Sequence, residues 1–329
     1  MKKVALKENV AVLFLFISLL MGGCSQQEPR DQVILQLKWF HQAQFAGFYV
    51  AQEQGYYEEE NLDVIFLEGG PEVDVLEQVQ SGNADLGIYS PEDILIARGQ
   101  GQPLVALAVI YQLNPMVFVS LEEGEIHHPA DLLGRTISLA PGGEIQFQAM
   151  MKKLDLELDR VEIKPFSYDY ESFYTGEVDV IEAYATGGLI RIHQQGLDVN
   201  TIWPGDYGVQ FYSDTLFTTA ERITGQPDLL ERFLRASLKG WQDTIEDQSA
   251  AVEITLRYAK EADPDLQAQM LNASIPLIHT GDYPLGWMDH DRWRGMHDTL
   301  LDQGLLDQPV DLTEVYTNRF LEAIYEVNP

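Results

Sequence analysis

The stretch from Leu35 to Glu68 constrains the fold more than any other part of this chain. Apolar and polar residues alternate up to Leu37, which is typical of a half-buried strand. Aromatic residues then recur at helical spacing from Phe45, and after Asn61 a second apolar run begins. The sequence therefore predicts a strand–helix–strand unit, from which α/β sheets are built.

The residues that directly follow the first strand are the first candidates for ligand binding. Trp39 and Gln42 lie in the short segment between this strand and the helix. Ligands of open α/β sheets bind outside the carboxyl ends of the strands. We therefore expect both side chains at a binding cleft.

The alternation of strands and helices continues along the chain, with a break at Asn114-Pro115 where we place a first crossing between two lobes. A second crossing over 208–212 returns the chain, and everything from Phe217 onward is expected to be helical. We predict an α/β protein of two lobes, with lobe 1 formed by 31–115 and 213–329 and lobe 2 by 116–212. Hinged lobes of this kind close around a ligand. The expected strands are 84–89, 104–111, 116–120, 161–166 and 176–184, and the expected later helices are 228–245, 250–258, 266–273, 289–303 and 316–327.

The N-terminus has the features of a secretory signal. Basic residues precede an apolar run from Val10 to Leu20, and small residues follow before Cys24. The run is shorter than the roughly 20 residues of a membrane span. We predict a signal peptide over 1–23, lipidation of Cys24 and a tether over 24–30; an ordinary free cysteine in an uncleaved anchor is the alternative.

Composition excludes several classes of protein. Cys24 is the single cysteine, so an internal disulfide and a cysteine-based metal site are excluded. The net charge of −31 excludes nucleic-acid binding by phosphate neutralisation. Two explanations of the charge stay open: an acidic docking surface, and adaptation to a salty habitat in which ions screen the repulsion.

Three motifs carry a resemblance to a known family. They are Leu37-Lys38-Trp39, Ala46-Gly47-Phe48-Tyr49-Val50-Ala51 and the run from Gly55 to Val64. The chain resembles the solute-binding proteins of ABC importers, in the group that contains sulfonate binders, binders of thiamine-pyrimidine precursors and thiamine pyrimidine synthases. The resemblance implies the type II periplasmic-binding-protein fold with two hinge crossings.

The resemblance also implies where a ligand lies. In pyrimidine-binding relatives the residues at the positions of Trp39, Tyr89 and Tyr184 line the cleft, and rings there sandwich a flat ligand. Offset stacking of such rings contributes about 0.5–1.5 kcal/mol beyond the area buried. The alternative is that these three rings belong to the core.

Two glycine segments complete the predicted site. Gly188 stands where pyrimidine-binding relatives have a glutamate, which argues against a simple transfer of their substrate and leaves room for a larger ligand. Gly143 and Glu144 lie in a glycine turn at a predicted helix start, where free N–H groups bind an anion or a carbonyl. The alternative for this turn is a tight connection between strand and helix.

The synthases of the group are the enzymatic alternative. By the resemblance they hold pyridoxal phosphate on a lysine and carry a reacting histidine four residues later, where this chain has Tyr89 and Asp93. A cysteine-rich loop of the synthases is replaced by 208–212. We therefore predict no catalysis and no cofactor. The pair His127-His128 has no third ligand at zinc spacing. His290 and His297 could share a helix face, but a solvated helix start with Asp289 as its N-cap explains this segment better, so we predict no metal site.

Together these features predict a lipid-anchored extracytoplasmic binding protein on the periplasmic face of a bacterial membrane. We expect a monomer that delivers a flat heteroaromatic molecule, a thiamine-pyrimidine precursor or riboflavin, to an ABC permease. A sulfonate ligand and a receptor-coupled sensory role stay open, as do the affinity and which membrane holds the lipid.

Overall fold

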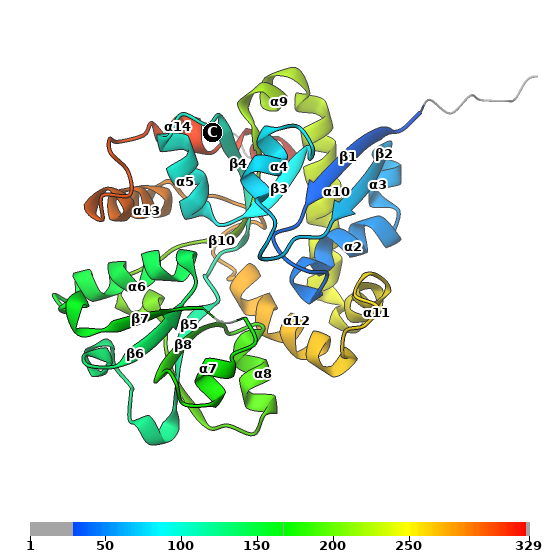
Figure 1. The fold of residues 1–329 in the computed structure, drawn as a ribbon. Helices are drawn as coiled ribbons and strands as arrows, with labels where there is room; N and C mark the ends of the chain where they lie inside the picture. The colour runs from blue at the N-terminus through cyan, green and yellow to red at the C-terminus, as the bar shows by residue number, and fades with distance from the viewer. Residues whose placement is uncertain (1–28, 167, 327–329) are drawn as a thin grey trace, which may run out of the picture. The chain divides into compact units, whose positions relative to one another are not determined.

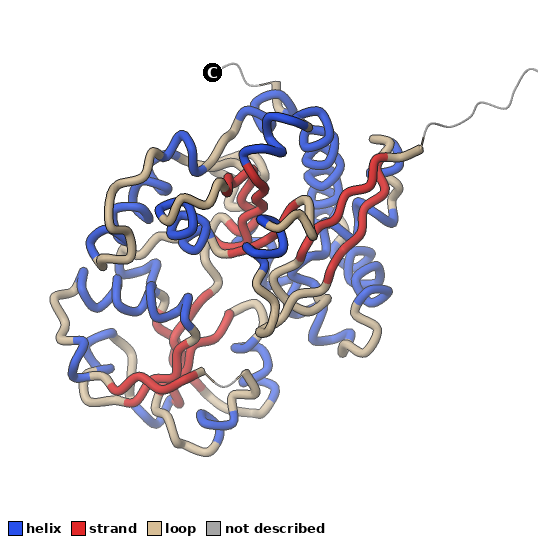
Figure 2. The backbone as a smooth tube through the Cα atoms, turned by 45° about the horizontal axis from the view of Figure 1, so that its top comes forward, coloured by secondary structure: helices blue, strands red, loops and turns tan. Residues whose placement is uncertain are grey.

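The computed structural model describes residues 29–166 and 168–326, which form two five-stranded sheets. Figure 1 shows the sheets and their helices, and Figure 2 shows the two separate groups of strands. The predicted signal peptide, Cys24 and most of the tether lie outside the described residues. No helix in the described part of the chain is long and apolar enough to cross a membrane.

The first sheet has the strand order β2-β1-β3-β10-β4 and defines lobe 1. β1 and β3 are parallel, whereas β10 runs antiparallel to both β3 and β4. The strands are β1 (Asp31–Gln36), β2 (Leu62–Leu67), β3 (Leu86–Tyr89), β4 (Leu104–Tyr111) and β10 (Ser213–Thr219). Helical segments of the same half are η1 (Ala43–Phe45), α2 (Ala46–Glu53), α3 (Tyr56–Glu59), α4 (Val75–Gln80) and α5 (Pro91–Gly99).

The second sheet has the order β7-β6-β8-β5-β9 and defines lobe 2. Its strands are β5 (Met116–Leu121), β6 (Thr136–Leu139), β7 (Glu162–Pro165), β8 (Val180–Tyr184) and β9 (Val199–Ile202). Its helical segments are η2 (Glu122–Gly124), η3 (Pro129–Leu132), α6 (Pro141–Lys153), η4 (Leu158–Arg160), α7 (Glu171–Tyr174) and α8 (Gly188–Gln194). The chain passes between the sheets at 112–115 and again at 203–212, which includes η5 (Pro204–Tyr207).

The C-terminal part is helical but begins later than predicted. Residues from Phe217 to Thr219 belong to β10, and Phe217 pairs with Gly87 and Ala106. The sequence gives no alternation here because β10 lies between two strands and is buried on both faces, while its threonines favour a strand. The predicted last helix also begins later, at Arg319, since Tyr316 forms a bridge to Ala106 of β4. The helices are α9 (Ala220–Gly225), α10 (Pro227–Glu246), α11 (Gln248–Tyr258), α12 (Pro264–Ile278), α13 (His290–Asp302), α14 (Leu312–Val315) and α15 (Arg319–Ile324).

Two glycines allow α2 and α10 to pack closely in lobe 1. A Cβ added at Gly47 would lie 2.1 Å from the ring of Trp241, and one at Gly240 would lie 2.2 Å from the Gly47 carbonyl. Trp241 is 1% exposed, so its ring fills the space that Gly47 leaves. The Ala-Gly motif of the sequence thus has a packing role.

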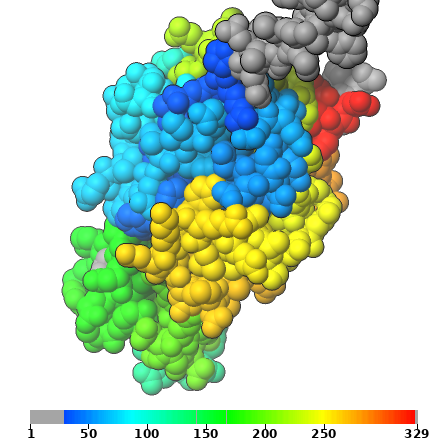
Figure 3. Space-filling view, turned by 90° about the vertical axis from the view of Figure 1, so that its right-hand side faces the viewer, coloured from blue at the N-terminus to red at the C-terminus, as the bar shows by residue number. Residues whose placement is uncertain are grey.

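Helix α12 contacts both lobes. It packs on α11 and η1 of lobe 1 and also contacts α8 of lobe 2. Figure 3 shows the yellow and orange surface of α11 and α12 lying between the blue surface of lobe 1 and the green surface of lobe 2. Contacts of this kind hold the two lobes against each other on one side of the hinge.

Candidate ligand-binding cleft

A lysine that follows β1 connects the two lobes. The Lys38 ammonium donates to Tyr184 Oη of lobe 2 at 3.2 Å and lies 3.4 Å from Ser90 Oγ. It also pairs with Asp214 Oδ1 at 3.3 Å. These groups come from the loop after β1, the end of β3, the end of β8 and β10, so strand ends of both sheets meet here. The Lys38 cluster consists of Lys38, Ser90, Glu92, Asp93, Glu182, Tyr184 and Asp214.

Lys38 carries its positive charge in this environment. Burial lowers its pKa, but Tyr184 and Asp214 raise it by more, so that the net pKa lies well above the ordinary value. Asp214 is 1% exposed and also accepts from Gln44 Nε2 at 2.6 Å. The pair is therefore a charged bridge shielded from solvent.

Two carboxyl groups of the cluster face the same region. Glu92 is 2% exposed; its Oε1 accepts from Gln146 Nε2 of lobe 2 at 3.3 Å, and its Oε2 has no partner. Burial, and then the charge of Asp93, raise the pKa of Glu92. Burial likewise raises the pKa of Glu182 to about 7. Both groups thus hold their protons to a higher pH than an exposed carboxyl group does.

The predicted anion site at the start of α6 is occupied by a side chain of the protein. Glu182 Oε2 accepts from the Ala140 N–H at 2.9 Å. A Cβ added at Gly143 would lie 1.8 Å from this oxygen, so the glycine makes space for the carboxyl group. Glu144 in the same turn instead accepts from Gln148 Nε2 at 2.9 Å.

Trp39 lies against an aromatic side chain of the other lobe. Its ring is 5.3 Å from Phe40 and 5.4 Å from Tyr168, which follows β7 in lobe 2. Trp39 is half-buried and Tyr168 is 50% exposed, so this contact lies near the surface rather than deep in a core. The sequence analysis did not select Tyr168, although Phe166, Tyr168 and Tyr170 alternate directly after a predicted strand.

The other predicted residues lie in different surroundings. Tyr89 is half-buried beside the cluster; burial, then Asp93, raise its pKa to about 12, while Lys38 lowers it. Gln42 donates to Gln44 Oε1 at 2.5 Å, and through Gln44 it connects to Asp214. A Cβ at Gly188 would lie 2.0 Å from Tyr170 Oη, so Tyr170 fills the room expected for a ligand.

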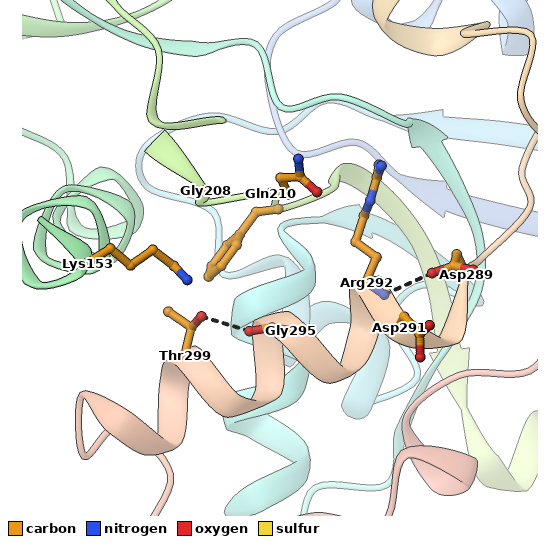
Figure 4. A pocket seen from close by; sticks show the side chains of 9 residues that line it. Lys153, Gly208, Gln210, Asp289, Asp291, Arg292, Gly295 and Thr299 are labelled. Carbon is orange, nitrogen blue, oxygen red and sulfur yellow. Dashed lines mark hydrogen bonds between the residues drawn. The ribbon is translucent and has the colours of Figure 1, made fainter. Parts of the chain in front are cut away.

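Two cavities lie beside the hinge. One of about 280 Å³ is lined by Lys153, Gln210, Asp289 and Arg292, which Figure 4 labels, and by Phe211, among others. The second, of about 220 Å³, shares Gln210, Phe211 and Arg292 with the first and is also lined by Gln146, Trp203 and Asp206.

Neither hinge cavity includes Trp39, Tyr89 or Tyr184. Both volumes fall below the about 300–1,000 Å³ of ordinary ligand pockets. Gln146 lines the second cavity and also bonds Glu92 across the lobes. Contacts between the lobes, Lys38 with Tyr184 and Gln146 with Glu92, thus lie across the strand-end region.

The histidines that invite a metal interpretation have other partners. His290 Nδ1 lies 3.0 Å from Tyr316 Oη, and His297 Nε2 accepts from the Val310 N–H at 3.1 Å. Among residues 29–166 and 168–326 no group of three or more metal-binding side chains is present. Asp289 caps α13 through the Arg292 N–H at 2.9 Å, as predicted for a helix start.

Solved structures share the fold. SsuA from Escherichia coli, a periplasmic aliphatic sulphonate-binding protein, has a TM-score of 0.71 at 14% identity over 86% of this chain and 91% of that chain. SsuA from Methylobacillus flagellatus has a TM-score of 0.70 at 15% identity over 91% and 95%. The two-lobe type II periplasmic-binding-protein fold with two hinge crossings is therefore confirmed, while the residue boundaries of the lobes stay a prediction.

Relatives in sequence cover nearly the whole chain. The riboflavin-binding protein RibY of Chloroflexus aurantiacus is 28% identical over 96% of this chain and 98% of its own length. The formylaminopyrimidine-binding protein of Halalkalibacterium halodurans is 26% identical over 94% and 96%. The 4-amino-5-hydroxymethyl-2-methylpyrimidine phosphate synthase THI11 of Saccharomyces cerevisiae is 31% identical over 88% of each chain.

The relatives thus include both binding proteins and a synthase. The family model described as NMT1/THI5 like matches residues 42–251, more than half of the sequence. This span contains most of the motifs quoted above together with both crossings between the sheets. The chain therefore belongs to the NMT1/THI5-like family.

Proposed function

We propose that this chain is the extracytoplasmic solute-binding lipoprotein of an ABC importer, and that it holds a flat heteroaromatic molecule between its lobes. The observation that carries the proposal is the meeting of strand ends from both sheets, where Lys38 bonds Tyr184 and Trp39 faces Tyr168. Opening of the hinge separates these pairs and uncovers both surfaces. A ligand between them is then enclosed when the lobes close.

Binding without chemistry is supported by the state of the lysine in the cleft. An amine forms an imine only when it is unprotonated, and lysines that do so have a lowered pKa. The pKa of Lys38 is raised, because Tyr184 and Asp214 outweigh the effect of burial. Tyr89 and Asp93 occupy the positions that the resemblance assigns to the lysine and histidine of the synthases. The residues of this chain therefore do not fit pyridoxal phosphate.

The shape of the cleft favours a flat ring. Trp39 and Tyr168 offer aromatic surfaces from opposite lobes, with ring centroids 5.4 Å apart. When the lobes separate, a flat ligand can enter between the two rings and stack on both. Relatives that bind riboflavin and formylaminopyrimidine show that family members hold flat heterocycles. A sulfonate is disfavoured because Glu182 already accepts from the N–H at the start of α6.

The proposed anchor rests on the signal-like N-terminus and Cys24, and the proposed partner rests on the family resemblance. Lipidation of Cys24, after cleavage of 1–23, would hold the folded part at the periplasmic face of a bacterial membrane, where it could deliver its ligand to an ABC permease. A receptor-coupled sensor would use the same closed form. Replacement of Cys24 by serine should release the protein from the membrane fraction, and retention of the Cys24→Ser protein there would contradict the anchor.

The ligand proposal is tested by calorimetry with riboflavin, formylaminopyrimidine and an alkanesulfonate. We expect one flat heterocycle to bind and to raise the melting temperature by mass action. Trp39→Ala should weaken this binding at least tenfold, whereas Tyr283→Ala, which removes an aromatic ring 38% exposed elsewhere in lobe 1, should leave it unchanged. Tight binding of the sulfonate with no response to the heterocycles would refute the ligand class.

A further inference from the structure

The Lys38 cluster contains more carboxyl groups than positive charges. Asp214 forms the ion pair with Lys38. Glu92, Asp93 and Glu182 have no second cation within the cluster as defined above. Burying an ionised carboxylate without a partner is costly, so these carboxyl groups favour a ligand that supplies hydrogen-bond donors.

Glu92 is the member with an unused bonding position. Its side chain is 2% exposed, yet Oε2 has no hydrogen-bond partner. The other oxygen is held by Gln146, which belongs to lobe 2. Because this bond joins the two lobes, their separation would leave both oxygens of the Glu92 carboxyl group without a partner from the protein.

We infer that Glu92 accepts an N–H from the ligand, and that the cleft selects uncharged or cationic heterocycles over their phosphorylated or sulfonated counterparts. The inference rests on the proposed function and names the chemistry of its cargo. A ligand N–H that ionises Glu92 leaves two adjacent carboxylates, Glu92 and Asp93, and these would repel a phosphate or sulfonate carried by the same ligand. At the start of α6, the Ala140 N–H already donates to Glu182 and is not free for an anion.

Binding should also release protons. The titratable groups around Glu92 are Asp93 on its own helix, Lys38 after β1, Tyr89 at the end of β3 and Tyr184 on β8, and α6 contributes the neutral Gln146. Burial keeps Glu92 protonated by raising its pKa. An N–H of the ligand stabilises the carboxylate, so the Glu92 proton passes to the buffer while the ligand keeps its own. Affinity should therefore rise with pH through the neutral range.

The test is calorimetry of the whole mature protein with two matched pairs of compounds. These are riboflavin beside riboflavin 5′-phosphate, and 4-amino-5-hydroxymethyl-2-methylpyrimidine beside its phosphate. Each titration is made in phosphate and in Tris, whose different ionisation enthalpies give the number of protons released. We expect the unphosphorylated member of at least one pair to bind at least tenfold more tightly and to release protons.

Two variants test whether Glu92 is the source of the proton release. Glu92→Gln should lose the proton release and weaken binding at least tenfold, whereas Glu177→Gln, an exposed acid of lobe 2, should change neither. The wild-type comparison needs no variant, so a misfolded Glu92→Gln protein leaves the test intact. If no heterocycle binds, the proposed function fails. If one binds without proton release and equally well when phosphorylated, only the present inference is overturned.

Discussion

Replacement of Lys38 by methionine should destabilise the protein strongly. The change keeps most of the side-chain volume but leaves Asp214, whose side chain is 2% exposed, without its cation. Removing one partner of a buried ion pair costs about 3–5 kcal/mol. Asp214 keeps its bond from Gln44 Nε2 at 2.6 Å, so we expect the lower end of this range, about 3 kcal/mol.

The assay is urea unfolding at pH 7, with the free energy of unfolding extrapolated to water. Lys164→Met is the matched control, because the Lys164–Glu162 pair is shorter, at 3.0 Å against 3.3 Å for Lys38–Asp214, but its side chains are 39% and 64% exposed. Exposed pairs contribute about 0–1 kcal/mol, so the control should lose far less. The double variant Lys38→Met/Asp214→Asn should recover most of the loss, since both charges are then gone. Equal losses for Lys38→Met and Lys164→Met would show that the bridge is not a shielded ion pair.

Two further predictions concern packing and pH. Gly47→Ala should lower the free energy of unfolding by about 3 kcal/mol or more, because its Cβ would lie 2.1 Å from the Trp241 ring. The control is Gly295→Ala in α13, whose Cβ would have nothing within 4 Å and which should raise the melting temperature. The pKa of Glu182 is raised by burial from 4.5 to about 7, so the folded state binds more protons than the unfolded state between these values. The free energy of unfolding should therefore fall as pH rises from about 4.5 to about 7. The urea midpoint of Glu182→Gln should fall less over this range than that of the wild type. Identical pH profiles for the wild type and Glu182→Gln would contradict the raised pKa of Glu182.

Most of the fold was predictable because local patterns and tertiary structure agree. The strand–helix–strand opening, the break at Asn114-Pro115 and the capping role of Asp289 each have a short-range signal, and the structure confirms them. β10 was missed because a strand buried on both faces has no alternation. Its position between β3 and β4 depends on residues more than 100 positions earlier in the sequence.

The chemistry of the cleft was less predictable than its location. Lys38 lay within a quoted motif but reads as a solvated side chain, since its partners Tyr184 and Asp214 are distant in sequence. Glu92 reads as a favourable acid in the first turn of a helix, yet α6 of the other lobe buries it. The glycines at 143 and 188 were selected for ligand approach, whereas Glu182 and Tyr170 occupy the space beside them.

Closure of the lobes on an intact cargo can be followed by spin labels on either side of the cleft. Glu72 of lobe 1 and Asp159 of lobe 2 are exposed and suit labelling in a Cys24→Ser background. The distance between the two spin labels should have a broad distribution without ligand and a single short value with the heterocycle that binds best. At the same ligand concentration, Trp39→Ala should keep the broad distribution. An unaltered distribution at full occupancy would contradict the account of a hinged, strand-end binding site.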